Sequence, residues 1–255
     1  MATLTFTDTH CHLADPALSA RSPDILAEAQ AAGVCRFIVP AARQADFAAV
    51  LSLAERPSVL PAVGLHPWFA DEFSDGLYSE TACILQGNPR VWVGEIGLDF
   101  IRAADSAARQ RQLDVFRRQL GLAKAYRRRV IVHNVKAAAA VAETVKTEGF
   151  GYGGIVHAFS GSLEEAQMLI RAGFKIGIGS LLLNPTAKKV RQAVQQLDLR
   201  DIVLETDSPF MLKDGVNTPA NVCRIAEIAA QLRGVSTEEI AVQTEKNVDA
   251  LWDAV

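Results

Sequence analysis

The sequence predicts an α/β fold, a single (β/α)8 barrel of the TIM-barrel type that spans residues 1–255 and carries one extra C-terminal helix. Three observations support this prediction. Eight short β-rich segments alternate with helical segments along the whole chain. The strand segments are apolar throughout, as expected of parallel strands covered on both faces. Several of them end at a histidine or a carboxylate, which predicts a metal site at the C-terminal rim of the strands.

The predicted strands are short and regularly spaced. They are Leu4–Thr9, Arg36–Pro40, Val59–Leu65, Val91–Ile96, Val130–His133, Ile155–His157, Lys175–Ile178 and Ile202–Thr206. Helical spacing occurs at Pro23–Ala32, Ser106–Tyr126, Lys136–Glu148, Leu163–Ala172 and Thr186–Leu197, and then in the last barrel helix, Asn221–Arg233, and the extra one, Thr237–Trp252. An open doubly wound sheet is the competing fold, but it would not bring polar residues from five distant strands to one point.

The composition indicates a globular protein without a membrane segment. Hydrophobic residues make up 49% of the chain, and a formal net charge of −3 gives no overall basic field for nucleic acid. We see no signal peptide and no apolar run near the ~18 residues of a membrane span. The four cysteines are scattered, which predicts reduced thiols and a cytoplasmic location. No segment indicates an obligate protein partner.

The strongest local signal is the pair His10 and His12 at the end of the first strand. Residues two apart in a strand share a face at about 6.6 Å, so both imidazoles can reach one ion. Cys11 between them is expected to point away and to pack. Hydrogen-bonded core histidines are the alternative, but two neutral imidazoles in an apolar barrel would need partners for four ring nitrogens.

Four further residues end strands in the same way. Glu95 follows an apolar run, where a buried carboxylate costs several kcal/mol unless it is paired or bound to metal, and it can bridge two ions. His133 and His157 end consecutive strands about 4.8 Å apart, so they can converge on a second ion. In a closed barrel Asp207 lies next to the first strand, where it can bind the first ion and accept a proton. The alternative for Glu95 is an ion pair with a basic residue of a neighbouring strand. For His133 and His157 it is a hydrogen-bonded place in the core, and for Asp207 it is a role in the turn before Ser-Pro.

Three more polar residues are predicted to support the site. His66 lies in a loop after a strand, where it can meet substrate or a leaving group. Asp99 lies in the loop after the fourth strand and can orient a ligand histidine. Glu205 alternates to the same face as Asp207 and can support it; the alternative is a salt bridge within the barrel.

The motifs together resemble the TatD family of metal-dependent deoxyribonucleases, which belongs to the amidohydrolase-like barrels. The matching stretches are DTHCHL, GLHP, VGEIGLDF, VIVHN, VHAFSGS, KIGIG, LETDSP, a later NTP and a terminal EKNVDALW. They cover nearly the whole chain in the family's order and approximate spacing. Such a series is specific, whereas a lone H-x-H would not be.

The resemblance implies a complete set of metal ligands. They would be His10, His12, Glu95, His133, His157 and Asp207, which hold two divalent ions with Glu95 as the bridge. It also implies phosphodiester hydrolysis, often as a 3′→5′ exonuclease on single strands or damaged ends. Some relatives are described as removing D-amino acids from tRNA.

The chain departs from the family pattern at three places. Asn134 and Val135, with Lys136 next, replace the usual Ser-Arg, and Val216 before Asn217 replaces a basic residue. The glycine pair after the seventh strand is Gly179-Ser180. The first two changes remove cations that would hold a phosphate, which lysine does less well than arginine. Lys136 and Asn217 are therefore the residues expected to contact substrate or to support the site.

These observations favour a hydrolase that cleaves phosphodiester bonds of DNA, or of another phosphoester, with water activated by two divalent ions and Asp207 as proton acceptor. Histidine-rich ligands favour Zn²⁺ or Mn²⁺, while Mg²⁺ is compatible with turnover. The alternative keeps the ions but cleaves an ester or amide, as a D-aminoacyl-tRNA deacylase would. A third hypothesis is a nucleic-acid-binding protein with structural metal, suggested by the basic runs Arg109–Arg111, Arg117–Arg118 and Arg127–Arg129.

Overall fold

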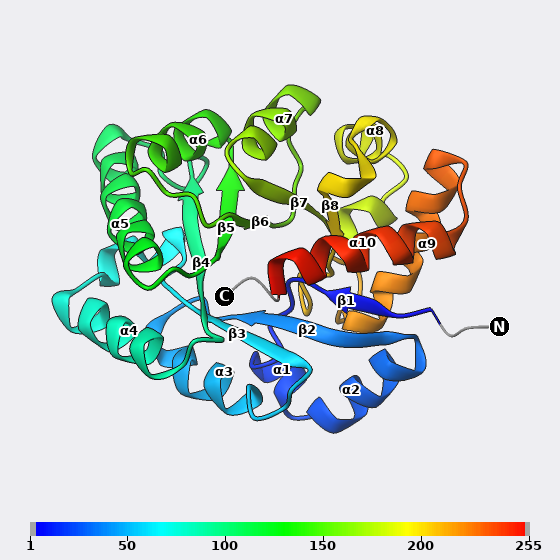
Figure 1. Cartoon of the computed structure of the whole chain (residues 1–255), viewed down its shortest axis with the longest axis horizontal. Helices are drawn as coiled ribbons and strands as arrows, with labels where there is room; N and C mark the ends of the chain where they lie inside the picture. The colour runs from blue at the N-terminus through cyan, green and yellow to red at the C-terminus, as the bar shows by residue number, and fades with distance from the viewer. Residues whose placement is uncertain (1–3, 253–255) are drawn as a thin grey trace.

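The computed structural model describes residues 4–252 and has the predicted barrel architecture (Figure 1). Eight parallel strands follow one another in sequence order. They are β1 (Phe6–Asp8), β2 (Val34–Pro40), β3 (Val59–Val63), β4 (Trp92–Asp99), β5 (Val130–Val135), β6 (Gly154–Val156), β7 (Phe174–Ile178) and β8 (Ile202–Leu204). The Thr9 amide donates to the Leu204 carbonyl at 3.0 Å, and the Asp207 amide donates to the His10 carbonyl at 2.8 Å. These bonds between the first and last strands nearly close the barrel.

Helices cover the outside of the strands (Figure 1). They are α1 (Pro16–Ser19), α2 (Ser22–Ala31), α3 (Phe47–Leu53), α4 (Asp75–Gly87), α5 (Ser106–Ala125), α6 (Ala138–Thr147), α7 (Leu163–Arg171), α8 (Lys188–Gln196) and α9 (Val222–Arg233). Short 3₁₀ turns are η1 (Gln44–Asp46), η2 (Pro67–Glu72), η3 (Ser180–Leu183), η4 (Leu199–Asp201) and η5 (Pro219–Asn221). The extra helix, α10 (Thr237–Trp252), is confirmed. The sequence prediction named no helix at α1, α3 or α4.

The strand ends at the functional rim differ from the prediction. β6 stops at Val156, so His157, predicted as the last residue of its strand, lies just beyond it, and β1 stops at Asp8, one residue before its predicted end. After the end of β1, the His10 amide donates to the Asp8 carboxylate at 3.2 Å instead of to a neighbouring strand. β5, in contrast, continues to Val135. A side-chain acceptor thus replaces a ladder bond at His10, whereas the His157 amide still donates to the Val132 carbonyl at 3.1 Å.

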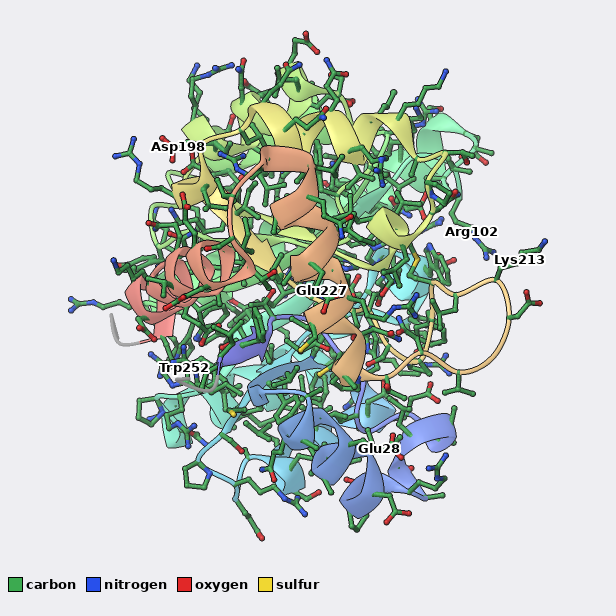
Figure 2. The ribbon with its side chains drawn as sticks, turned by 90° about the vertical axis from the view of Figure 1, so that its right-hand side faces the viewer. Glu28, Arg102, Asp198, Lys213, Glu227 and Trp252 are labelled. Carbon is green, nitrogen blue, oxygen red and sulfur yellow. The ribbon has the colours of Figure 1, made fainter. Side chains whose placement is uncertain are left out.

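The interior of the barrel is filled at its amino-terminal end by strand residues together with α10. The cluster consists of Ile38, Leu60, Ala62, Trp92, Ile131, Ile155, Val203, Val248 and Leu251. Each buried aliphatic side chain in such a cluster stabilises the fold by about 1.5–3 kcal/mol. In Figure 2, Trp252 of α10 lies at one end of the molecule, and Arg102 and Lys213 project from the other. One end of the barrel is therefore sealed, which leaves the carboxyl ends of the strands for the site.

Two expectations about the chain's environment concern its helices and its cysteines. Within residues 4–252 no helix combines the length and the apolar character that crossing a bilayer requires. All four cysteines are free thiols, and Cys11 is fully buried against the Ile38 carbonyl, as its packing role predicts. The cytoplasmic location stays a prediction.

Candidate metal centre

A cavity of about 660 Å³ opens at the carboxyl ends of the strands. Its floor carries residues from distant parts of the chain, namely His12, His66, Glu95, His133, His157 and Asp207. Apolar and aromatic side chains form much of its wall, among them Trp68, Phe69, Leu181, Phe210 and Met211. This is the usual position of a site in a barrel, because the loops that follow the strands meet there.

The first group of donors gathers around the His10–His12 segment. His10 Nε2 lies 3.1 Å from His12 Nε2 and 3.3 Å from Glu95 Oε2. Asp207 Oδ1 lies 3.5 Å from each of these two ring nitrogens. The segment is held in an extended form because the Cys11 amide donates to the Ile38 carbonyl at 3.2 Å and the His12 amide to the Ser208 carbonyl at 2.7 Å.

The second group of donors gathers around the other oxygen of Glu95. Glu95 Oε1 lies 2.9 Å from His133 Nδ1, 2.7 Å from His157 Nε2 and 3.1 Å from His66 Nε2. His133 Nδ1 and His157 Nε2 are 3.1 Å apart. Each oxygen of Glu95 thus faces its own set of imidazoles, in the arrangement that a bridging carboxylate requires.

The chemistry of these donors fits divalent ions better than it fits a hydrogen-bonded core. At metal–nitrogen distances of about 2.0–2.1 Å, neighbouring ligand atoms are about 3.0–3.4 Å apart. The 3.1 Å separations in both histidine pairs match that spacing. Three donor trios in the site are close enough to hold an ion.

Burial and mutual contact set the charge states of the donors. Burial lowers the pKa of His10 to about 4, which keeps its imidazole neutral, as a ligand must be. Burial alone would raise the pKa of Glu95, but His157, His66 and His10 hold it well below its usual range. Burial also opposes ionisation of Asp207, yet its hydrogen bond with His12 lowers the pKa of that carboxyl. Two ionised carboxylates therefore face the buried rings.

Asp99, predicted to lie in a loop, is instead the last residue of β4, and its carboxylate lies beside His133. Asp99 Oδ2 lies 3.5 Å from His133 Nε2 and accepts the Trp68 indole N–H at 2.7 Å. Its other oxygen accepts the backbone amides of Ile101 and Arg102, each at 3.0 Å. Although burial lowers the pKa of His133, its contacts with Asp99 and Glu95 raise it to about 9.

Two buried carboxyl groups lie beside the donors without facing the cavity. Glu205 accepts a hydrogen bond from the Ala158 amide and forms no salt bridge in the described part of the chain, so that alternative is wrong. Its carboxyl fits because Gly177 has no side chain: a Cβ there would lie 2.3 Å from Glu205 Oε2. Burial raises the pKa of Glu205 well above its usual range and that of Asp8 to about 7. Asp8 accepts the Thr206 amide at 2.9 Å, and sequence reasoning missed it.

Asn217 and Lys136 are not brought to the cavity. Asn217 is fully buried, and its amide donates to the Ser180 hydroxyl and the Thr206 and Phe210 carbonyls at 2.8–2.9 Å, which ties down the loop after β8. Lys136 lies just past the end of β5, is exposed and does not line the cavity. Direct substrate contact stays a prediction for both residues, and the hydrogen bonds of Asn217 fit the supporting role that was the other expectation.

His66 was predicted to meet substrate, but it lies among the donors. Its backbone belongs to the turn before η2, and its Nδ1 accepts the Trp68 amide at 3.1 Å, which directs Nε2 toward Glu95. The signal in the sequence was the same one that marks the other histidines, a strand followed directly by an imidazole. Arg43, Trp68 and Phe210, which sequence reasoning did not single out, also line the cavity.

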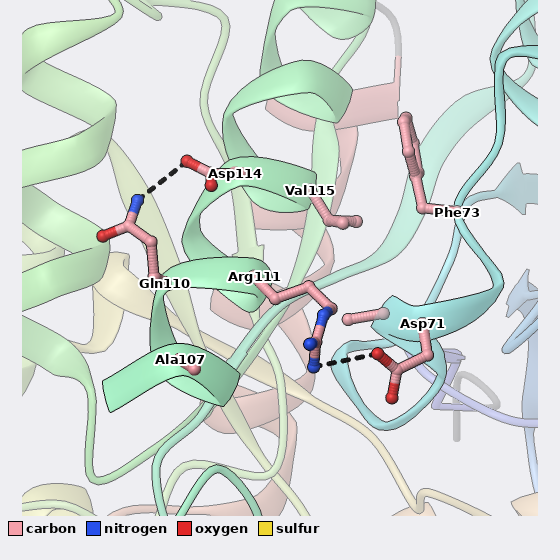
Figure 3. A pocket seen from close by; sticks show the side chains of 8 residues that line it. Asp71, Phe73, Ala107, Gln110, Arg111, Asp114 and Val115 are labelled. Atoms are coloured by element: carbon pink, nitrogen blue, oxygen red, sulfur yellow. Dashed lines mark hydrogen bonds and ion pairs between the residues drawn. The ribbon is translucent and has the colours of Figure 1, made fainter. Parts of the chain in front are cut away.

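A second hollow beside α5 is shallower and chemically different (Figure 3). Arg111 and Asp71 form an ion pair of 2.9 Å across it, and Gln110 donates to Asp114 at 2.9 Å. It contains no histidine, so it does not compete with the first cavity as a metal site.

The chain is similar over nearly its whole length to known proteins. The sequence profile described as TatD related DNase matches residues 7–253. An Escherichia coli K12 protein named uncharacterized metal-dependent hydrolase YjjV is 36% identical, over 97% of this chain and 98% of that protein. The crystal structure of YjjV, a TatD homologue, superposes with a TM-score of 0.90 at 34% identity and covers 98% of both chains. Human deoxyribonuclease TATDN3 is 32% identical, over 96% of this chain and 93% of that protein. The chain therefore belongs to the TatD family of metal-dependent hydrolases.

Proposed function

We propose that this chain hydrolyses phosphodiester bonds of DNA, as a TatD-like 3′→5′ exodeoxyribonuclease that uses two divalent ions. The observation that carries the proposal is the Glu95 carboxylate, whose two oxygens each face a separate set of imidazoles. Sites with two neighbouring ions are typical of enzymes that hydrolyse phosphoesters. A relative that covers 96% of this chain is named deoxyribonuclease, which supports DNA as the substrate.

The two groups of donors would each hold one ion. The first would be His10, His12, Glu95 and Asp207; the second would be Glu95, His133, His157 and, in addition to the predicted ligands, His66. The predominance of imidazole favours Zn²⁺ or Mn²⁺ over Mg²⁺. When bound, such ions make water more acidic and polarise the phosphoryl oxygen.

Asp207 is the residue proposed to accept the proton from the attacking water. Its side chain is 13% exposed and lines the cavity, whereas that of Glu95 is 2% exposed. Its lowered pKa keeps the carboxylate ionised and able to take a proton. Asp99 would hold His133 in orientation through the contact at Nε2.

A second candidate function is hydrolysis of an ester or amide, for example deacylation of D-aminoacyl-tRNA. The observation that favours it is the apolar Val135 in the cavity wall, where the family pattern has an arginine. Arg43 also lines the cavity, however, so a cation is present from another loop.

A binding role without catalysis has less support. The basic runs that suggested it lie along and just after α5, and three of their arginines form ion pairs. Arg111 binds Asp71 at 2.9 Å, Arg117 binds Asp114 at 3.1 Å and Arg118 binds Asp75 at 3.0 Å. Arginines occupied in this way present little free charge to a nucleic acid.

The test is a substrate panel with the metal removed and restored. Single-stranded DNA labelled at the 5′ end, RNA, aminoacyl-tRNA and a generic phosphoester are offered to wild type and to Asp207→Asn. We expect DNA cleavage from the 3′ end that is lost with chelator, regained with Mn²⁺ or Zn²⁺, and lost in the variant. Faster turnover of the aminoacyl ester than of DNA would favour the second function, and activity that survives chelation would contradict both.

A further inference from the structure

Exposed aromatic side chains stand on both sides of the donor cluster. Trp68 is 51% exposed, and its ring centroid lies 4.9 Å from that of His66. Phe210 is 50% exposed, and its ring centroid lies 5.6 Å from that of His12. His66 and His12 contact opposite oxygens of Glu95, Oε1 and Oε2. The two aromatic rings therefore flank the place where the reacting bond has to lie.

Large aromatic side chains are normally buried, because their exposure to water is unfavourable, so the exposed position of these two rings needs a reason. A buried ring of this size stabilises a protein, whereas here both rings line a cavity and remain half in solvent. The Trp68 side chain is held in place because its indole N–H donates to Asp99 at 2.7 Å. A fixed, exposed ring next to a charged centre is suited to stacking with a planar group of a ligand.

Two guanidinium groups lie over aromatic rings that line the cavity. The Arg102 guanidinium lies 4.4 Å above the Trp68 ring, and that of Arg43 lies 4.1 Å above the Phe69 ring. No carboxylate in the described part of the chain lies within 4.0 Å of the Arg102 guanidinium, whereas Arg43 is paired with Glu72. Arg102 projects at the open end of the barrel (Figure 2). Arg43 and Arg102 lie in other loops than Val135 and Val216, the two valines that stand where the family pattern has a basic residue.

We propose that Trp68 and Phe210 each stack on one unpaired nucleobase, on opposite sides of the scissile phosphodiester, and so determine which strands are cleaved. The inference rests on the proposed function. The bases must be unpaired because in a duplex their faces are already stacked on neighbouring bases. A volume of about 660 Å³ is also in the range of sites that hold small ligands, which suits a strand end.

The test compares oligonucleotides that lack one base. Single strands carry an abasic residue either on the 3′ side or on the 5′ side of the scissile bond, and kcat/KM is measured against the complete strand. For wild type we expect about a tenfold loss for each missing base. In Trp68→Leu the loss disappears at one of the two positions, and in Phe210→Leu it disappears at the other. Tyr152→Leu, a partly exposed aromatic residue that does not line the cavity, should keep both losses.

Trp68→Phe separates stacking from the hydrogen bond to Asp99. It keeps an aromatic face and removes the indole N–H, so the base preference should remain. If Trp68→Phe loses the preference as completely as Trp68→Leu does, the effect comes from Asp99 and the stacking role is wrong. Equal base preferences in wild type and both leucine variants would also overturn it.

A binding measurement distinguishes this inference from the proposed function. A strand with 2-aminopurine at either position is titrated with the protein in chelator, where no cleavage occurs. Quenching of the 2-aminopurine fluorescence that disappears in the leucine variants supports stacking of the bases on Trp68 and Phe210. Quenching in wild type without any cleavage of DNA after metal is restored would contradict the proposed function alone. Cleavage of DNA without quenching of the fluorescence would contradict the stacking role of Trp68 and Phe210 alone.

Discussion

The two ends of the barrel differ in the kinds of side chain that they bring together. At the end sealed by α10, Arg36 forms ion pairs of 2.7 Å with both Glu245 and Asp249, and the neighbouring side chains are apolar. At the open end, imidazoles and carboxylates crowd together at 2.7–3.7 Å while buried ring nitrogens lack partners. The comparison teaches that the closed end is built from apolar packing and ion pairs, whereas the open end gathers side chains that could hold an ion. Substitutions at the two ends should therefore affect stability and activity separately.

The largest expected effect is on catalysis at the open end. Asp207→Asn should lower kcat about 10²–10⁴-fold, because an amide cannot accept the proton from water. The thermal midpoint should change little, since the amide keeps the shape of the side chain. Single-turnover kinetics and thermal denaturation measure the two effects. Asp201→Asn, near the start of β8 at the other end of the barrel, is the matched control and should leave kcat unaltered. Near-normal turnover by Asp207→Asn would remove it from the mechanism.

The complementary effect is on stability at the sealed end. Leu251→Ala should lower the free energy of unfolding by about 2–5 kcal/mol, because it leaves a cavity between α10 and the barrel interior. Turnover by the folded fraction should not change. Denaturant titration with an activity assay tests this, and Val242→Ala, exposed on the same helix, should cost under about 0.5 kcal/mol. If Leu251→Ala abolished turnover in fully folded protein, the two ends would not be separable.

A smaller effect is expected from the residue that orients His133. Asp99→Asn should weaken metal binding or activity about 10–100-fold, because the neutral amide holds the imidazole less firmly. Asp71→Asn is the control, because it removes a carboxylate that lines the second hollow and is paired with Arg111 outside the donor cluster. Metal affinity by calorimetry is the measurement. An affinity equal to wild type in both variants would argue against a role for Asp99.

The effect that is smallest per step, at about tenfold for one pH unit, is the pH dependence of metal binding. In the metal-free chain the pKa of His133 is raised to about 9, so the ring carries a proton at neutral pH that a metal ion must displace. Affinity should therefore fall as pH falls, by about tenfold per pH unit below 9 for this one proton. Titrations with Mn²⁺ at about pH 6.5, 7.5 and 8.5 measure the slope. A flat profile would mean that His133 enters the site without a proton.

Much of the fold could be predicted because its signals are local. Continuous apolar runs such as those of β4 and β5 repeat along the chain, and a polar residue that ends such a run is visible without coordinates. A closed barrel then forces residues like His10 and Asp207, far apart in sequence, to the same rim. The convergence of the predicted donors follows from topology alone.

The parts that could not be predicted depend on contacts between loops. Nothing in the order of residues shows that Glu205 fits beside the donors only because Gly177 leaves room, or that Asn217 is consumed inside its own loop. The direction of Lys136 depends on a turn after β5 whose backbone φ is 55°, unusual for a residue with a side chain. The places of Trp68 and Phe210 in the cavity wall could not be predicted, because no sequence pattern distinguishes an exposed aromatic residue from a buried one.

The most direct test of the two-set arrangement is the number of ions that the chain binds and its dependence on Glu95. Metal-free protein is titrated with Mn²⁺ or Zn²⁺ by calorimetry, with metal analysis after gel filtration. The account predicts two ions per chain for wild type and a loss of at least one in Glu95→Gln, since an amide cannot serve both sets of imidazoles. Two ions bound equally tightly by wild type and Glu95→Gln, or a single ion in wild type, would contradict it.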